Sequence, residues 1–102
     1  MSQLPYYAVI FTSTRTNNDH GYGVVAQQMV DLAFMQEGFI GVESAREQVG
    51  ITVSYWQTLE DISKWKKQID HQLAQKKGRD IWYSTYTVRI CKVEREYSFT
   101  AM

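Results

Sequence analysis

Apolar positions along this chain follow two different periods, and each change of period marks where a strand gives way to a helix. Residues 6–13 (YYAVIFTS) are β-branched and aromatic, which favours a strand. The polar segment that follows ends at Gly21 and is typical of a loop. From Tyr22 the apolar residues recur every three or four positions as far as Gly38, which predicts an amphipathic helix.

A second amphipathic helix is predicted from Thr58 onward. Thr58 and Asp61, three residues apart, have the spacing of a capping box, in which the side chain of the first residue satisfies a backbone N–H of the first turn. The helix ends in lysines before Gly78, where positive charge favours the carbonyl end of the helix dipole. Its apolar stripe consists of Leu59, Ile62, Trp65, Ile69 and Leu73.

Three more strands complete the pattern. Residues 39–48 and 51–57 predict a hairpin joined near Gly50, and residues 81–93 predict a long last strand. The order is therefore strand, helix, strand, strand, helix, strand. That order indicates an α+β ferredoxin-like sandwich, in which a four-stranded antiparallel sheet carries both helices on one face.

The predicted strands carry large side chains on both faces, although the helices cover only one. In the strand at 51–57, Ile51, Val53 and Tyr55 alternate with Thr52, Ser54 and Trp56. A solvated sheet face does not normally hold so much apolar surface. We therefore expect a second copy to stack on the free face, giving a two-fold homodimer with a barrel-like core, and the tail at 94–102 to reach across to it with Tyr97 and Phe99. A monomer with a wet face is the alternative.

Composition narrows the class of protein. A chain of 102 residues forms one domain, with a core at about 6–93 and a C-terminal arm at 94–102. Eleven basic residues balance eleven acidic ones, so we expect no nucleic-acid or anionic-membrane partner. The apolar runs are too short for a membrane span and a signal peptide is not recognisable. One cysteine and two histidines, without a CxxC motif, favour a cytoplasmic protein with no protein-built metal site.

The stretch at 65–83 concentrates the candidate chemistry. Trp65 lies on the apolar stripe, so it is either a core anchor or a pocket wall whose indole N–H orients a substrate. His71 lies nearly opposite that stripe, so it faces solvent unless the helix bends, and residues 68–70 contain no Pro or Gly to bend it. Inside a pocket, a neutral imidazole would suit a general base or a haem ligand.

Further candidates lie at the helix end and on the strands. Arg79 either offsets the helix dipole or holds an anion at the pocket mouth. Trp82 and Tyr83 are neighbours in a predicted strand, so alternation sends them to opposite faces and only one of them lines a given cavity. The same argument separates Tyr55 from Trp56.

Four segments, in their order and spacing, resemble a known family. They are QEGFIGVESA at 36–45, ITVSYW at 51–56, the pattern W…H…AQ…GR…WY from the second helix onward, and RICKVEREYSF at 89–99. Together they resemble the antibiotic biosynthesis monooxygenase (ABM) superfamily of dimeric α+β barrel proteins. Its members include cofactor-independent oxygenases of polyketide quinols, haem-degrading enzymes and many small proteins of unknown activity, with a site between the helices and the concave sheet face.

The resemblance implies a monooxygenase, cofactor-independent, that acts on a small aromatic or quinol-type substrate. It places Trp65 and His71 at positions that oxygenase and haem-degrading members use, and Arg79 joins them as a catalytic candidate. The expected substrate pocket consists of Tyr22, Tyr55, Trp82 and Tyr83.

Other functions stay open from the residues alone. A haem-binding or haem-degrading protein would use His71 as an axial ligand. The haem-degrading members, however, carry an Asn on the first strand, and residues 6–13 contain none, which counts against that form of the activity. A non-catalytic binder of an aromatic ligand, or a purely structural dimer, would have the same fold.

Overall fold

The computed structural model describes residues 3–17, 21–76 and 82–101, with the side chains of 72–76 excepted. Within these residues the elements are β1 (Tyr6–Arg15), α1 (Tyr22–Phe34), β2 (Phe39–Arg46), β3 (Gly50–Trp56), α2 (Leu59–Lys76) and β4 (Tyr83–Val93). This is the predicted order of strands and helices.

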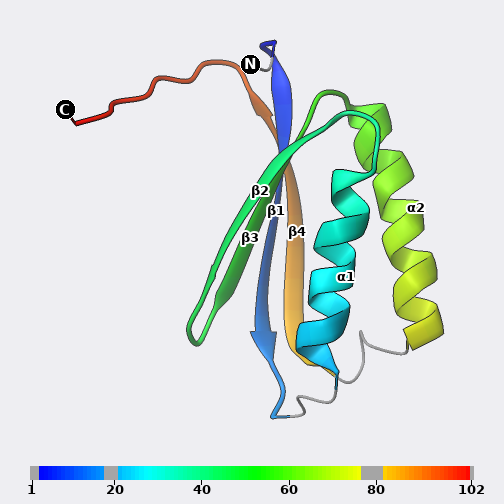
Figure 1. The fold of residues 1–102 in the computed structure, drawn as a ribbon. Coiled ribbons are helices and arrows are strands. Elements are labelled where there is room, and N and C mark those ends of the chain that lie inside the picture. Colours follow the sequence, from blue (N-terminus) through cyan, green and yellow to red (C-terminus); the bar gives the residue numbers. More distant parts are fainter. Residues whose placement is uncertain (1–2, 18–20, 77–81, 102) are drawn as a thin grey trace.

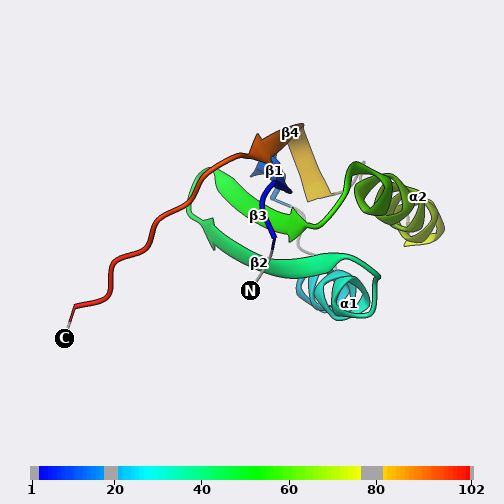
Figure 2. The same cartoon turned by 90° about the horizontal axis from the view of Figure 1, so that it is seen from above.

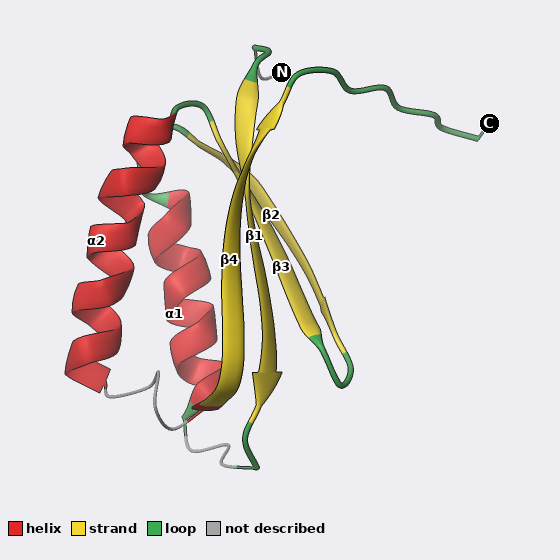
Figure 3. Ribbon diagram, turned by 180° about the vertical axis from the view of Figure 1, so that it is seen from behind, coloured by secondary structure: helices red, strands yellow, loops and turns green. Residues whose placement is uncertain are grey.

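The four strands form one antiparallel sheet in the order β2-β3-β1-β4. Both helices lie on the same side of it, and the C-terminal segment after β4 extends away on the other side (Figure 1). The views from above and from behind agree on this arrangement (Figures 2 and 3). The predicted ferredoxin-like sandwich is therefore confirmed, with one sheet face covered by helices and the other free.

The ends of several elements differ from the sequence prediction. The first helix ends at Phe34, where the N–H groups of Met35 and Gln36 bond to Leu32 and Ala33 at 3.1 and 3.0 Å in a tightened last turn. Gly38 then takes a left-handed conformation, φ 80°, that turns the chain into β2. β1 continues to Arg15, two residues beyond the predicted end, while β2 ends at Arg46.

The core lies between the sheet and α2 and is built around tryptophans. Trp56 on β3 is fully buried, with 0% of its surface exposed. Its ring lies 5.5 Å from that of Trp65 on α2 and 5.2 Å from that of Phe39 on β2. Ala33 and Ile62 complete the buried cluster. Aromatic side chains of this size supply most of the buried area in a small domain.

The predicted capping pair at the start of α2 forms the hydrogen bond from the first turn to the Thr58 hydroxyl. The Thr58 hydroxyl oxygen accepts from the backbone N–H of Asp61 at 3.0 Å and donates to the Asp61 carboxylate at 2.7 Å. The same carboxylate lies against Gly38, where a Cβ atom would collide with it. Gly38 is thus required both for its left-handed backbone and for the close approach of Asp61.

Replacement of Thr58 by alanine is expected to lower the free energy of unfolding by about 1 kcal/mol, because the first turn of α2 loses its side-chain acceptor. For a domain of this size the midpoint of thermal unfolding falls by about 4–8 °C. Circular dichroism during heating measures it. Thr58→Ser keeps the hydroxyl and serves as the control; a fall of the same size in both variants would contradict the capping role.

No helix among the described residues is long and apolar enough to cross a membrane.

Candidate functional site

Two β-bulges decide which side chains face the helices. In β2 the register shifts between Phe39 and Gly41, so that both Phe39 and Arg46 lie on the helix side although strict alternation would separate them. In β4 the shift opposite Thr14 and Arg15 skips Ser84, and Arg15 then pairs with Tyr83. The bulges bring these groups to one face of the sheet.

An aromatic cluster lies on the helix side at the end of β1 and the start of β4. The ring of Tyr22, the first residue of α1, contacts both Trp82 and Tyr83 edge-on, at 5.6 and 6.0 Å. Phe11 on β1 lies 5.4 Å from Tyr83 and 5.4 Å from Tyr86, the second pair being stacked. Five aromatic side chains therefore form one continuous cluster, in which Trp82 is buried and the other four are partly exposed.

This cluster corrects one sequence prediction. Trp82 and Tyr83 were expected on opposite faces, with only one lining a given cavity, yet both contact Tyr22. The prediction was wrong because β4 begins at Tyr83, so Trp82 lies before the strand and the alternation of strand side chains does not extend to it. Tyr22, Trp82 and Tyr83, three of the predicted pocket residues, are thus brought together.

Arg15 fixes the cluster to the end of β1. Its guanidinium carbon lies 3.5 Å from the centre of the Tyr22 ring, a close cation–π contact, and its Nε donates to the Trp82 carbonyl oxygen at 3.3 Å. The backbone N–H of Thr16 donates to the same carbonyl at 2.8 Å. These contacts hold the beginning of α1 and the beginning of β4 against β1.

A second arginine reaches the same region from the other edge of the sheet. Arg46, Gly50, Ser13 and Tyr86 occupy one row across the four strands. The Arg46 side chain crosses over Gly50, and its guanidinium donates to the hydroxyl oxygen of the buried Ser13. Any side chain at Gly50 would occupy the place of this guanidinium, so the glycine is what permits the crossing.

The charges of both arginines act on Tyr83. Burial raises the pKa of the Tyr83 hydroxyl well above its usual range, and the hydrogen bond to the Tyr22 hydroxyl at 3.5 Å adds to the shift. Arg46 and Arg15 lower the same pKa, though by less. Tyr83 is therefore a neutral phenol at physiological pH, and the positive charges of both arginines act on its hydroxyl.

The catalytic candidates from the sequence lie elsewhere. Trp65 is buried against Trp56 as part of the core. The helix α2 runs through His71 without a break, and the His71 side chain is exposed. The condition set for His71 to enter the pocket, a bend in this helix, is therefore not met. Arg79 lies outside the described residues.

Tyr55, the remaining predicted pocket residue, lies on the opposite face of the sheet from the cluster. It pairs with Ala8 on β1, whereas its neighbour Trp56 enters the core beneath the helices. Its hydroxyl donates to Glu43 at 2.7 Å, and this hydrogen bond raises the pKa of Tyr55 to about 12. Tyr55 thus belongs to the free face, hereafter the open face.

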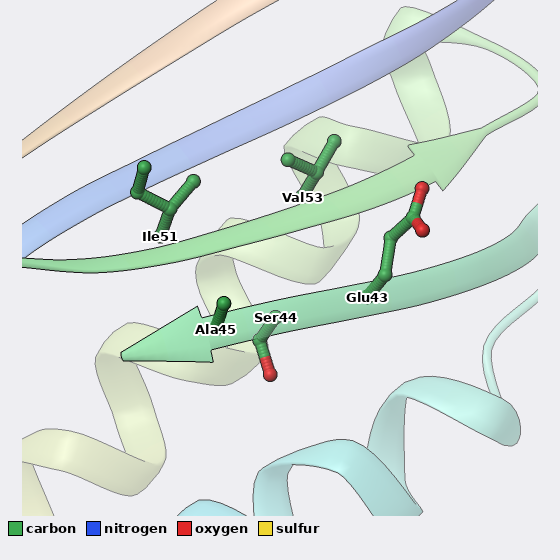
Figure 4. A pocket seen from close by; sticks show the side chains of 5 residues that line it. All are labelled: Glu43, Ser44, Ala45, Ile51 and Val53. Atoms are coloured by element: carbon green, nitrogen blue, oxygen red, sulfur yellow. The ribbon is translucent and has the colours of Figure 1, made fainter. Parts of the chain in front are cut away.

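The open face carries a shallow hollow on the β2–β3 hairpin. Its volume is about 290 Å³, and it is lined by Glu43, Ser44, Ala45, Ile51 and Val53. Figure 4 shows Ile51, Val53 and Ala45 pointing to the same side of the hairpin, with Ser44 directed away from them. The side chain of Ile51 is 45% exposed. The hollow is an apolar surface with a carboxylate at its edge.

Sequence reasoning did not identify Phe11, Ser13, Arg15, Arg46 and Gly50. The apolar pattern assigned Phe11 to an ordinary strand core, and the two arginines stand at strand ends, where charged residues are common. The one signal available was Gly50 at the start of a strand, since an isolated glycine in such a pattern indicates a bulge or a close approach of other atoms. The sequence pattern assigns Gly50 to the hairpin turn, so it does not predict the approaching side chain.

Comparison with solved structures defines the class of protein. A "putative antibiotic biosynthesis monooxygenase" from Nitrosomonas europaea superposes with a TM-score of 0.67 at 9% identity, over 89% of this chain and 91% of that one. A protein of unknown function from the same organism gives a TM-score of 0.74 at 8% identity, over 96% and 98%. The chain has the ABM-like fold, so the resemblance seen in the sequence is confirmed at the level of the fold.

Comparison of sequences finds a relative with much higher identity than the solved structures. The chain is 53% identical to the uncharacterized protein YqjZ of Bacillus subtilis, over 93% of this chain and 85% of YqjZ, and it belongs to the same family. No protein-family model matches the sequence.

Proposed function

We propose that this chain is a monooxygenase of the ABM type, cofactor-independent, and that it acts on a small aromatic or quinol-type substrate on the helix side of the sheet. The observation that carries the proposal is the surface formed by Phe11, Tyr22, Trp82, Tyr83 and Tyr86. Planar rings stack on such surfaces, and a dry aromatic wall keeps water away from reactive intermediates. The fold shared with a Nitrosomonas europaea protein named for this activity supports the reaction class.

The chemistry asks little of the protein. A deprotonated quinol passes electrons to O₂ directly; one oxygen atom enters the substrate, the other leaves as water, and the substrate supplies the reducing electrons. The protein must orient the ring, support the developing oxyanion and exclude water. The neutral hydroxyl of Tyr83 donates to Tyr22 over a long 3.5 Å, and by turning its single O–H it would become a donor to a substrate oxygen.

The sequence candidates have unequal support in this scheme. Trp65 acts through the core, by holding Trp56 and the sheet in place. His71 as general base would need α2 to open, because the helix is continuous and the side chain is exposed. Arg79 stays a candidate for the pocket mouth on the chemistry of its guanidinium alone.

The haem alternative does not fit the described residues. It requires His71 as an axial ligand inside the pocket, and the unbroken helix leaves that side chain exposed. We derive no step through haem. The second candidate function is a non-catalytic binder of an aromatic ligand, which the same aromatic surface supports and which needs no base.

Oxygen uptake on a simple hydroquinone tests the proposed activity. Uptake above the uncatalysed rate is expected, and Tyr83→Phe should reduce it by at least about tenfold because an oxyanion donor is lost. Tyr55→Phe makes the same change on the open face and should leave uptake unaltered. If the protein binds the hydroquinone but no oxygen is taken up, the oxygenase is contradicted and the non-catalytic binder is supported.

The partner we propose is a second copy of this chain, stacked on the open face to give a homodimer. The hollow at Ile51 and Val53 presents apolar surface on this side of the sheet. The C-terminal segment extends away from the domain (Figure 1) and carries Tyr97 and Phe99, which are 85% and 90% exposed. Aromatic side chains on an extended arm gain burial only against another surface, and a two-fold axis supplies the same surface to both arms.

A further inference from the structure

Within the part of the chain that the structure describes, Arg46 has no acidic partner. Among the described residues its hydrogen-bond partner is the neutral hydroxyl of Ser13, which is 2% exposed. A guanidinium offers five N–H donors in a planar fork, and one hydroxyl satisfies a single donor. The Arg46 side chain is itself exposed, so its remaining donors are open to a ligand.

Contacts with three strands fix the position of the Arg46 guanidinium. The side chain leaves an edge strand, passes over Gly50 on β3 and ends at Ser13 on β1, so three strands define where the guanidinium lies. Arg15 stands two residues after Ser13 on the same face and is held by Tyr22 and the Trp82 carbonyl. Both positive charges act on the Tyr83 hydroxyl, which lies in the aromatic cluster.

An uncovered apolar strip begins beside these charges. On the helix side of the edge strand β4, Tyr86, Val88 and Ile90 are 41%, 47% and 52% exposed. Tyr86 lies in the Arg46 row, and Phe11 stacks on it at 5.4 Å. The surface is therefore cationic at one end and aromatic and aliphatic along its length.

We propose that this surface is a subsite for an aromatic ligand that carries an anionic group at one end. The carboxylate or phenolate oxygen binds the guanidinium of Arg46, while the ring lies on Phe11 and Tyr86 and extends toward Val88. A planar fork matches a carboxylate in geometry as well as in charge. The inference rests on the proposed function for the location of the site, and it adds the substrate class, an anionic aromatic rather than a neutral one.

Binding of 2-naphthoate, which is not a quinol and needs no turnover, tests this subsite by titration calorimetry. The full-length protein should bind 2-naphthoate at least about tenfold more tightly than neutral 2-naphthalenemethanol, since only the acid makes charge-assisted hydrogen bonds. Arg46→Ala should lower the affinity for 2-naphthoate by at least about tenfold and leave the affinity for 2-naphthalenemethanol unchanged. Lys64→Ala, which removes an exposed charge on α2, is the matched control.

Gly50→Ala provides a second variant that removes no charge. Its Cβ would occupy the place of the Arg46 guanidinium, the flexible end of a side chain, so the guanidinium moves while the strand is kept. Binding of 2-naphthoate should weaken in this variant too, at an unfolding temperature close to that of the original chain. The proposal would be overturned by any of three results. These are equal affinity for the acid and the alcohol, no binding of the acid at about 1 mM, and unchanged binding of the acid in both variants.

The outcomes separate this inference from the proposed function. Oxygen uptake together with binding of 2-naphthoate that does not depend on Arg46 would contradict the proposed subsite and support the oxygenase activity. Binding of 2-naphthoate that depends on Arg46, without oxygen uptake, would support the subsite and indicate a non-catalytic binder.

Discussion

Trp56→Ala is expected to lower the free energy of unfolding by about 3–5 kcal/mol. Trp56 is fully buried and its ring contacts Trp65 and Phe39, so its removal leaves a cavity that joins β2, β3 and α2. Domains of this size have only about 5–15 kcal/mol of stability, so the loss is at least about a fifth of the total. The midpoint of thermal unfolding should fall by at least about 12 °C.

Chemical denaturation monitored by circular dichroism measures this effect. Trp56→Phe keeps much of the ring volume and should lose clearly less stability. Met35→Ala removes a side chain that is 79% exposed and should change stability by less than about 0.5 kcal/mol. A loss below about 1.5 kcal/mol in Trp56→Ala would show that the tryptophan pair does not form the centre of the core.

Val53→Asp is expected to abolish the proposed homodimer while leaving the single chain folded. Val53 lines the hollow of the open face, so an aspartate there would be buried without a partner when two sheets stack. A two-fold axis places the charge in the interface twice, and the cost is paid for both copies. We expect the dimer dissociation constant to rise by at least about 10³-fold.

Sedimentation over a range of protein concentrations measures the dissociation constant. Val24→Asp is a matched control, because it makes the same substitution at a position in the first turn of α1 that is 65% exposed. A negative charge in that turn is favourable to the helix, so the control should stay folded and dimeric. A monomeric mass for the original chain at micromolar concentration would contradict the homodimer, and an unaltered Val53→Asp dimer would contradict the open face as its interface.

Local sequence patterns predicted the elements because the forces that form them are local. The change from strand to helical period at Tyr22 and the capping pair Thr58 and Asp61 depend on residues close in the chain, and the structure confirms both. The order of these elements then leaves few ways to bury the apolar faces, which is why the ferredoxin-like sandwich followed. Helix phase also predicted that His71 points away from the apolar stripe unless α2 bends, and His71 is exposed on a continuous helix.

The candidate site was predicted only in part. Tyr22, Trp82 and Tyr83 were expected in the pocket and do lie together, whereas Tyr55 lies on the open face. The argument that separated Trp82 from Tyr83 assumed unbroken alternation along the strand. Strand β4 begins only at Tyr83, and where it begins depends on its pairing with β1, so counting along the sequence did not show that Trp82 lies outside it.

The sequence by itself determined the fold class and the order of helices and strands, because periodicity and capping act over short distances along the chain. The ABM-like resemblance came from the sequence as well. Only the tertiary structure decided that Arg46 crosses Gly50 to meet Ser13 and that Arg15 holds Tyr22. Those groups come from different strands, and their meeting depends on register and on two bulges. Register is fixed by the packing of the whole sheet, and the aromatic and cationic surface follows from it.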